Sequence, residues 1–234
     1  MFYAIHSRAV VYLRVVLTVS LMLVLLGGCF VDSGGRSNST SPEDAVVSRA
    51  FSEDEWFTDA APDSGLEFVH FSGASGEMYF PEIMGSGVAL FDYDNDGDLD
   101  AYFVQGSMLA ANKTIDQALF PPKGKTIPRG RLYRNDLLVH ANGTRTPWFT
   151  DQTDGSGIET VGYGMGVAVG DIDNDGWVDL YLTHVGPNQL FRNQGNGTFA
   201  DVSRQSRTDD PGWGVSAAFV DYDRDGHLDL VVVA

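Results

Sequence analysis

An acidic pattern of nine residues occurs three times in the chain, with aspartates at positions 1, 3, 5 and 9 and a glycine at position 6. The copies occupy residues 92–100, 171–179 and 221–229. Carboxylates at this spacing around a glycine turn gather hard oxygen ligands at one point, as Ca²⁺ requires. We therefore predict about three calcium sites. The predicted ligands are Asp92, Asp94, Asp96, Asp98, Asp100, Asp171, Asp173, Asp175, Trp177, Asp179, Asp221, Asp223, Asp225, His227 and Asp229.

Position 7 differs in every copy, being Asp98, Trp177 or His227, so its side chain is not the shared ligand. A backbone carbonyl serves at this place in other calcium loops, and we predict the same here. An EF-hand is excluded because position 12 is apolar in all three copies, where that motif needs a bidentate glutamate. The loops therefore belong to turns between strands.

The alternative is that these segments are plain Asp/Gly turns, since both residues favour turns for backbone reasons alone. However, four acidic side chains within nine residues repel one another unless a cation lies among them. Mg²⁺ fits less well, because it keeps several waters and uses few protein carboxylates. We expect the bound metal to have a structural role.

The repeat extends on both sides of each acidic loop. A strand rich in glycine precedes each loop, and glycine there allows another backbone to approach closely. An apolar run follows each loop, as expected for a buried strand. Further strand-like elements follow the first two loops, with an Asn-Gly turn in each copy, which favours a hairpin. These elements are Leu132–Asn135 and Leu190–Asn193, Asn142–Gly143 and Asn196–Gly197, and Phe149–Asp151 and Phe199–Asp201.

The spacing of the repeats fixes the size of the unit. Phe149 and Phe199 are 50 residues apart, as are Asp171 and Asp221. A unit of about 50 residues with four short antiparallel strands is a β-propeller blade, so the predicted class is all-β. The first copy is longer, with insertions near residues 70–80 and 107–129. Loops on a rigid scaffold often determine binding specificity.

Taken together, the acidic loops and their leading Gly-x-Gly-Val strands resemble FG-GAP/VCBS repeats, which form the seven-bladed propeller of integrin α-subunit type. Residues 80–100, with the Leu-Phe-Arg-Asn and Asn-Gly-Thr-Phe-Ala-Asp elements, resemble more narrowly the cartilage acidic protein family and its bacterial ASPIC/UnbV relatives. The resemblance runs from about Trp56 to the last residue. It implies a calcium-stabilised extracellular binding module without assigned catalytic residues.

Residues 51–234 contain three acidic loops, which correspond to about two and a half blades. A propeller closes with four to eight blades. We therefore expect this sequence to be the N-terminal part of a longer propeller, truncated at its C-terminus. The alternative is that partner chains complete the ring.

The first 28 residues have the composition of an export signal. Arg8 and Arg14 precede the apolar run 15–26, and small residues stand directly before Cys29, the single cysteine. The segment resembles a lipoprotein signal peptide, in which Cys29 becomes the lipidated first residue. Residues 29–50 are then a flexible tether. The alternatives are an ordinary signal peptide or a retained membrane anchor. The predicted location is the bacterial envelope, at the outer membrane or cell surface.

A formal charge of −17 excludes a surface for nucleic acid, since no basic stripe is present to contact phosphates. We predict a calcium-binding adhesion module whose partner is a surface protein or a glycan, held at the membrane by the lipid alone, and no enzymatic activity. The alternative is the scaffold of an exported enzyme whose catalytic elements lie in the missing C-terminal region.

Overall fold

The computed structural model describes residues 2–5, 8–12, 57, 59–122 and 127–234. The predicted tether and Cys29 lie outside the described residues, as does the apolar run 15–26. Within 1–28, the structure describes two strands, β1 (Phe2–Ile5) and β2 (Arg8–Tyr12). No helix among the described residues has the length and apolar character needed to cross a membrane.

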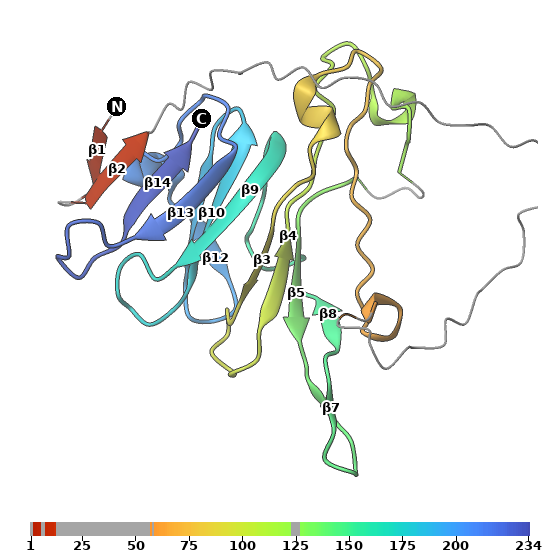
Figure 1. Cartoon of the computed structure of the whole chain (residues 1–234), viewed down its shortest axis with the longest axis vertical. Coiled ribbons are helices and arrows are strands. Elements are labelled where there is room, and N and C mark those ends of the chain that lie inside the picture. Colours follow the sequence, from red (N-terminus) through yellow and green to blue (C-terminus); the bar gives the residue numbers. More distant parts are fainter. Residues whose placement is uncertain (1, 6–7, 13–56, 58, 123–126) are drawn as a thin grey trace, which may run out of the picture. The chain divides into compact units, whose positions relative to one another are not determined.

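Two complete four-stranded antiparallel sheets follow the predicted repeat (Figure 1). The first has the order β3-β4-β5-β8 and the second β12-β11-β10-β9. Strands pair with their neighbours in the sequence, which is the meander of a propeller blade. The bounds in the first sheet are β3 Val88–Phe91, β4 Asp100–Phe103, β5 Arg131–Asn135 and β8 Phe149–Asp151, and in the second β9 Tyr163–Gly170, β10 Asp179–Val185, β11 Gln189–Asn193 and β12 Phe199–Asp201.

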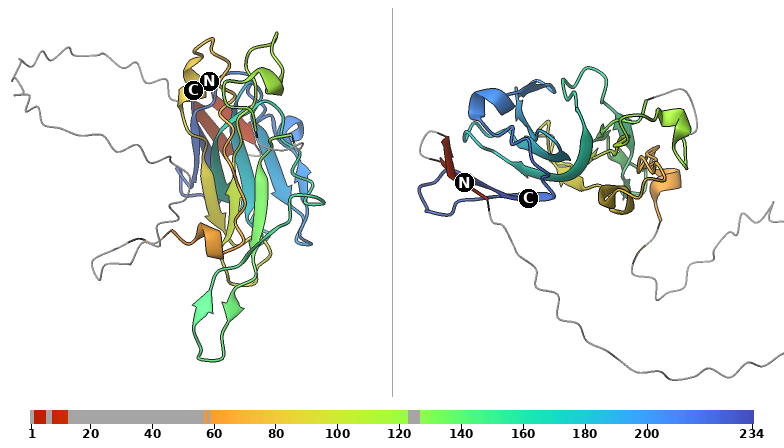
Figure 2. Two further views of the ribbon diagram at one scale, coloured as in Figure 1. Left: turned by 90° about the vertical axis from the view of Figure 1, so that its right-hand side faces the viewer. Right: turned by 90° about the horizontal axis from the view of Figure 1, so that it is seen from above.

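The third sheet contains β13 (Ser216–Val220) and β14 (Asp229–Val233), which form an antiparallel hairpin around the third acidic loop. Strand β2 pairs in parallel with β14, and β1 pairs with β2. A small hairpin, β6 (Leu138–Val139) with β7 (Arg145–Thr146), extends from the first sheet (Figures 1 and 2). The predicted all-β class with four-stranded antiparallel units is confirmed.

The helical elements are short and lie in the connections between strands. Among the residues that the structure describes, three are 3₁₀ turns and one is a single α-helical turn. None flanks an acidic loop, so the prediction that the loops join strands is confirmed. The bounds are η1 Ala61–Asp63, η2 Phe80–Ile83, η3 Ile115–Gln117 and α1 Ser203–Ser206.

The sheets pack face to face, and their cores lie between them. The first core joins β3–β5 to β10–β12 through side chains that include Phe91, Leu132 and Leu180. The second joins β9–β11 to β13 and β14 through Tyr181, Val232 and their neighbours. Each fully buried large apolar side chain contributes about 1.5–3 kcal/mol to folding.

The glycines before each loop allow the sheets to touch along their first strands. Gly87 N–H donates to Met165 O at 2.7 Å, and a Cβ on Gly87 would lie 3.2 Å from the Cα of Gly166. A Cβ on Gly166 would in turn lie 2.8 Å from Val215 O. The Gly-x-Gly pattern therefore sets the spacing between neighbouring sheets, and with it the distance between neighbouring acidic loops.

Candidate metal centres

The three acidic loops lie at the same end of their hairpins and repeat one hydrogen-bond pattern. In the first loop, the carboxylate of Asp92 accepts the N–H of Asp96 at 3.1 Å and that of Gly97 at 2.9 Å. The position-5 carboxylate then accepts the N–H of Asp98 at 2.9 Å. The second and third loops repeat both features at 2.8–3.1 Å, through Asp171 and Asp175, and through Asp221 and Asp225.

Two residues per loop have a positive φ, which bends the backbone around the carboxylates. Position 4 is left-handed in each copy, with φ of 59° at Asn95, 59° at Asn174 and 62° at Arg224. Asparagine tolerates this region better than most residues. The glycine at position 6 has φ between 87° and 93° in the three copies. The glycine that the sequence pattern emphasised is therefore required by the backbone.

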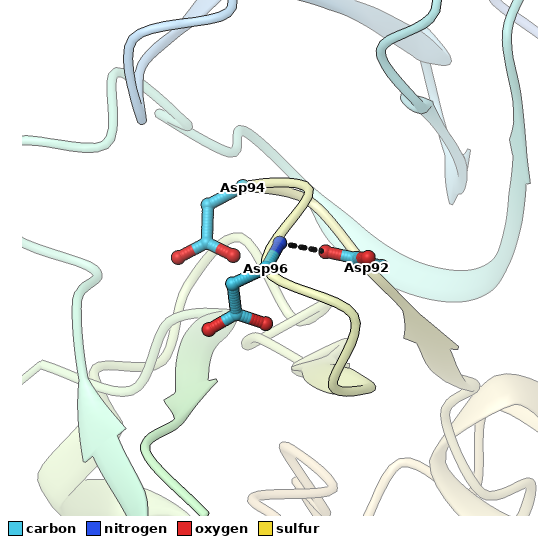
Figure 3. Close-up of side chains that lie close together, drawn as sticks. All are labelled: Asp92, Asp94 and Asp96. Carbon is cyan, nitrogen blue, oxygen red and sulfur yellow. Dashed lines mark hydrogen bonds between the residues drawn. The ribbon is translucent and has the colours of Figure 1, made fainter.

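Figure 3 shows the carboxylates of Asp92, Asp94 and Asp96 at the first loop. One oxygen from each of these carboxylates lies within 4.8 Å of the other two, and the same holds for positions 1, 3 and 5 of the third loop. In the second loop the group consists of Asp171, Asp173 and Asp179. Positions 1 and 3 therefore come together in all three loops.

The position-3 carboxylates carry the clearest sign of a site for a cation. One oxygen of Asp94 and one of Asp173 are shielded from solvent and have no hydrogen-bond partner. A shielded oxygen without a partner is costly. Burial raises the pKa of Asp94, and the charges of Asp96 and Asp92 raise it further. Crowded carboxylates with an oxygen left free fit a hard divalent cation such as Ca²⁺.

At the second loop, the positive charge of an arginine partly offsets the negative charge of the carboxylates. Arg192 in β11 lies 2.6 Å from an Oδ2 of Asp173 and 3.0 Å from Asp175. The matching residue of the first sheet, Arg134, instead contacts Asp136 at 2.6 Å. The two loops therefore have the same backbone but different surrounding charges.

Position 9 has a second role that the sequence pattern did not reveal. Asp100 is fully buried, and its two oxygens accept the N–H of Tyr93 at 3.0 Å and of Asn135 at 2.8 Å. Asp179 makes the matching bonds to Ile172 and Asn193. Burial raises the pKa of both Asp100 and Asp179 to about 6.

The third copy shares part of this pattern, since Asp229 accepts the N–H of Tyr222 at 2.9 Å. Position 9 therefore ties the loop to its own sheet. Only in the second loop does it also join the described carboxylate group, through Asp179.

Asparagines at the ends of β5 and β11 also hold the loops, a role that the sequence reasoning missed. The amide of Asn135 donates to Leu99 O at 3.2 Å. The amide of Asn193 donates to Val178 O at 3.2 Å and to Tyr93 O in the first loop at 2.8 Å. The signal was present as the final residue of the repeated Leu-x-Arg-Asn elements.

At position 7 the side chains have different surroundings in the three loops. Trp177 lies against the turn at Gly195, where an added Cβ would come within 2.8 Å of its ring. His227 lies 3.1 Å from the amide of Asn174. The side chain of Asp98 lies outside the described carboxylate group of its loop. The backbone carbonyls at position 7 remain predicted ligands.

A model of the FG-GAP-like repeat matches residues 171–232, which contain the second and third acidic loops and the strands between them. The chain contains an FG-GAP-like repeat. Its similarity to cartilage acidic protein 1 of Mus musculus is 41% identity over 91 residues, which cover 38% of the chain and 12% of that protein. The predicted resemblance to FG-GAP repeats and to the cartilage acidic protein family is therefore confirmed. The chain corresponds to a small part of this relative's length.

Proposed function

We propose that this FG-GAP repeat module binds Ca²⁺ at its three acidic loops and uses the ion to brace the blade hairpins. The observation that carries the proposal is the repeated convergence of carboxylates around position 3, with an oxygen of Asp94 and of Asp173 left without a partner. Ca²⁺ accepts several carboxylate and carbonyl oxygens in flexible geometry, which matches this donor set. The ion would offset the repulsion among the loop carboxylates.

Calcium and folding are coupled in this proposal, because an ion that binds the folded chain alone stabilises it by mass action. We expect calorimetric titration of Ca²⁺ into the chelator-treated full chain to show about one ion per loop. The melting temperature should rise with free Ca²⁺ and fall again in excess chelator. The variant Asp94→Asn should lose one ion. Absence of binding in the intact chain would refute the calcium proposal.

The described residues of the two inserted segments contact each other at the end of the first sheet opposite its acidic loop (Figure 1). Leu119 N–H donates to Ala74 O at 2.7 Å, and the ammonium of Lys113 donates to Ser75 O at 2.6 Å. The hydroxyl of Tyr163 in β9 donates to Ser72 O at 2.8 Å. The inserted segments are therefore anchored to each other and to the second sheet.

These inserted segments expose several large apolar side chains. Ile83 is 77% exposed and Phe120 is 74% exposed, whereas the hydroxyl of buried Ser75 donates to the buried carboxylate of Glu82 at 2.6 Å. Phe80 makes an edge contact with Trp213, with ring centroids 5.9 Å apart. Exposed apolar groups of this kind mark interaction sites. The exposed members are Met78, Tyr79, Phe80, Ile83, Leu119 and Phe120.

We therefore propose that the inserted segments carry the surface for a protein or glycan partner. Aliphatic groups beside the aromatic rings favour a protein. Full-length protein saturated with Ca²⁺ should bind members of a surface-protein and glycan array. The double variant Phe80→Ser/Phe120→Ser should lose that binding yet keep its calcium stoichiometry. Val139→Ser changes an exposed apolar residue on the separate β6–β7 hairpin and is the matched control. Equal loss in the control would refute this location.

Export and lipid anchoring are proposed from the N-terminal sequence, where Cys29 follows an apolar segment and small residues. The module would then work outside the cytoplasm, as a non-enzymatic adhesion module on the bacterial envelope. Metabolic labelling with a lipid analogue should mark the full-length protein, and Cys29→Ser should abolish the label. Unchanged labelling in that variant would refute lipidation at this residue.

A further inference from the structure

Each of the first two acidic loops donates one hydrogen bond to the loop that follows it. The amide of Asn95 donates to the carbonyl of Gly176 at 3.0 Å, across 81 residues of sequence. The amide of Asn174 donates to the carbonyl of Gly226, also at 3.0 Å. Both asparagines stand at position 4 of their loops, and both acceptors are the position-6 glycine. The same contact, from the position-4 amide to the position-6 carbonyl of the next loop, therefore occurs twice.

The acceptor carbonyl lies in the peptide group that also holds a loop carboxylate. The peptide between Gly176 and Trp177 accepts the Asn95 amide at its oxygen, and its N–H donates to Asp175 at 3.0 Å. Hydrogen bonds at the two ends of one peptide polarise each other and strengthen together. The amide thus helps to hold the position-5 carboxylate of the next loop.

The third loop receives the same contact. His227 N–H donates to Asp225 at 2.8 Å, and the preceding carbonyl accepts the Asn174 amide. In this loop the imidazole Nδ1 also lies 3.1 Å from that amide. A chain of amide, peptide and carboxylate therefore runs from the first loop to the second, and from the second to the third.

The donor asparagine stands between two carboxylates of its own loop. Asn95 is flanked by Asp94 and Asp96, both members of the described carboxylate group. A cation held by these two neighbours would fix the left-handed backbone from which the amide projects. The contact between loops is exposed to solvent, so it is free to break when the donor loop is mobile. Order in one loop therefore reduces the entropy that the next loop loses on binding.

We infer that the acidic loops bind calcium with positive cooperativity in series, with Asn95 and Asn174 as positioning residues that connect each site to the next. This inference rests on the calcium function proposed above. Charge repulsion between neighbouring bound ions would act in the opposite direction, so a positive sign distinguishes the amide link. The buried amide of Asn193 also contacts both loops, through Tyr93 O and Val178 O, and it is left unchanged in every variant of the test so that the test isolates the Asn95 contact.

Trp177 allows the second loop to be observed by itself. It is the position-7 residue of that loop, so its indole can sensitise the luminescence of Tb³⁺ bound there as a stand-in for Ca²⁺. The first and third loops carry Tyr93 and Tyr222 and no tryptophan, and the part of the indole-sensitised signal that Asp171→Asn/Asp173→Asn removes is assigned to the second loop. The readout is the Tb³⁺ affinity of this loop in the full chain.

The test is a double-variant cycle between the first loop and its amide. Asp92→Asn/Asp94→Asn disables the first loop, and Asn95→Gly removes the amide while keeping a residue suited to positive φ. We expect the disabled first loop to lower the Tb³⁺ affinity of the second loop by about two- to tenfold. In the N95G background the same disabling change should have little effect. Arg224→Gly makes the same kind of change at position 4 of the third loop, outside the measured site, and is the matched control that should leave this coupling intact.

Two outcomes would overturn the inference. The first is equal affinity of the second loop whether or not the first loop is disabled, which would show independent sites. The second is the same loss of affinity in the N95G background, which would show that coupling does not pass through the amide. Failure of the proposed calcium function gives a different result, namely no sensitised Tb³⁺ luminescence at the second loop of the unaltered protein.

Discussion

His184 should make the folded module sensitive to acid. It lies in β10, is 1% exposed, and its Nδ1 has no hydrogen-bond partner. Desolvation lowers the pKa of His184 from its usual 6.5 to about 4, because the charged imidazolium is disfavoured away from water. The unfolded chain takes up this proton at a higher pH than the folded chain does. The stability that the neutral His184 ring contributes is therefore fully present above pH 6.5 and is lost as the pH falls from 6.5 toward 4.

The size of the effect follows from the difference between the two pKa values. A shift of one unit corresponds to about 1.4 kcal/mol, so the neutral His184 accounts for a loss of about 3 kcal/mol between pH 6.5 and pH 4. Buried carboxylates act in the opposite direction. Asp100, with a pKa of about 6, favours folding more as the pH falls below that value when no metal is bound. The histidine effect must therefore be isolated by comparing variants.

Denaturant unfolding of the full chain in chelator, at pH 7 and at pH 4, provides the comparison. His184→Gln removes the titrating ring, and its loss of stability between the two pH values should be smaller than that of the unaltered protein by about 3 kcal/mol. His140→Gln alters an exposed histidine between β6 and β7 and is the control. Identical pH dependence in H184Q and the unaltered protein would refute the reasoning, because the buried ring would then not be the acid-sensitive group.

Three further substitutions test the loops and the packing between sheets. Arg192→Gln removes the guanidinium that lies 2.6 Å from Asp173, so the Tb³⁺ affinity of the second loop should rise by about two- to fivefold in the luminescence assay. A fall in affinity would show instead that the arginine positions the ligands. Asn193→Ala leaves two buried carbonyls without their amide donor and should lower the free energy of unfolding by about 1–3 kcal/mol in denaturant titration, whereas an unchanged midpoint would contradict its bracing role. Gly166→Ala forces a Cβ to within 2.8 Å of Val215 O, so thermal unfolding should show a loss of about 1–3 kcal/mol, and equal stability would mean that the sheets can separate at no cost.

The strands and turns of the blades could be predicted because their causes are local. Alternating and apolar runs, Asn-Gly turns and glycines before each loop specify hairpins within a few residues of sequence. The 50-residue repeat then indicated four short antiparallel strands in each blade, because the second copy contains the same elements as the first. The prediction of β5 at Leu132–Asn135 and of β8 at Phe149–Asp151 agrees closely with the structure.

The contacts that make the loops rigid could not be predicted, because they join residues far apart in the sequence. Asn135 donates its N–H to Asp100 across 35 residues, and their approach depends on the length of the insertion between β4 and β5. The Asn95 contact depends on how the first sheet packs against the second. A pattern of residue types does not specify how one sheet is aligned against the next, and it does not specify where a side-chain amide points.

The aspartate at position 9 shows how one residue type serves two physical roles within a single motif. The partly exposed carboxylates at positions 1 and 3 are crowded together in all three loops, where a bound cation would reduce their repulsion. Asp100 and Asp179 instead lie in the buried start of a strand, where two backbone N–H groups hold each carboxylate. Those N–H groups belong to position 2 of the loop and to the third strand of the sheet. The proposed metal binding at the loop and the pairing of strands within the blade therefore depend on the same hydrogen-bonded backbone, so stabilising one should also stabilise the other.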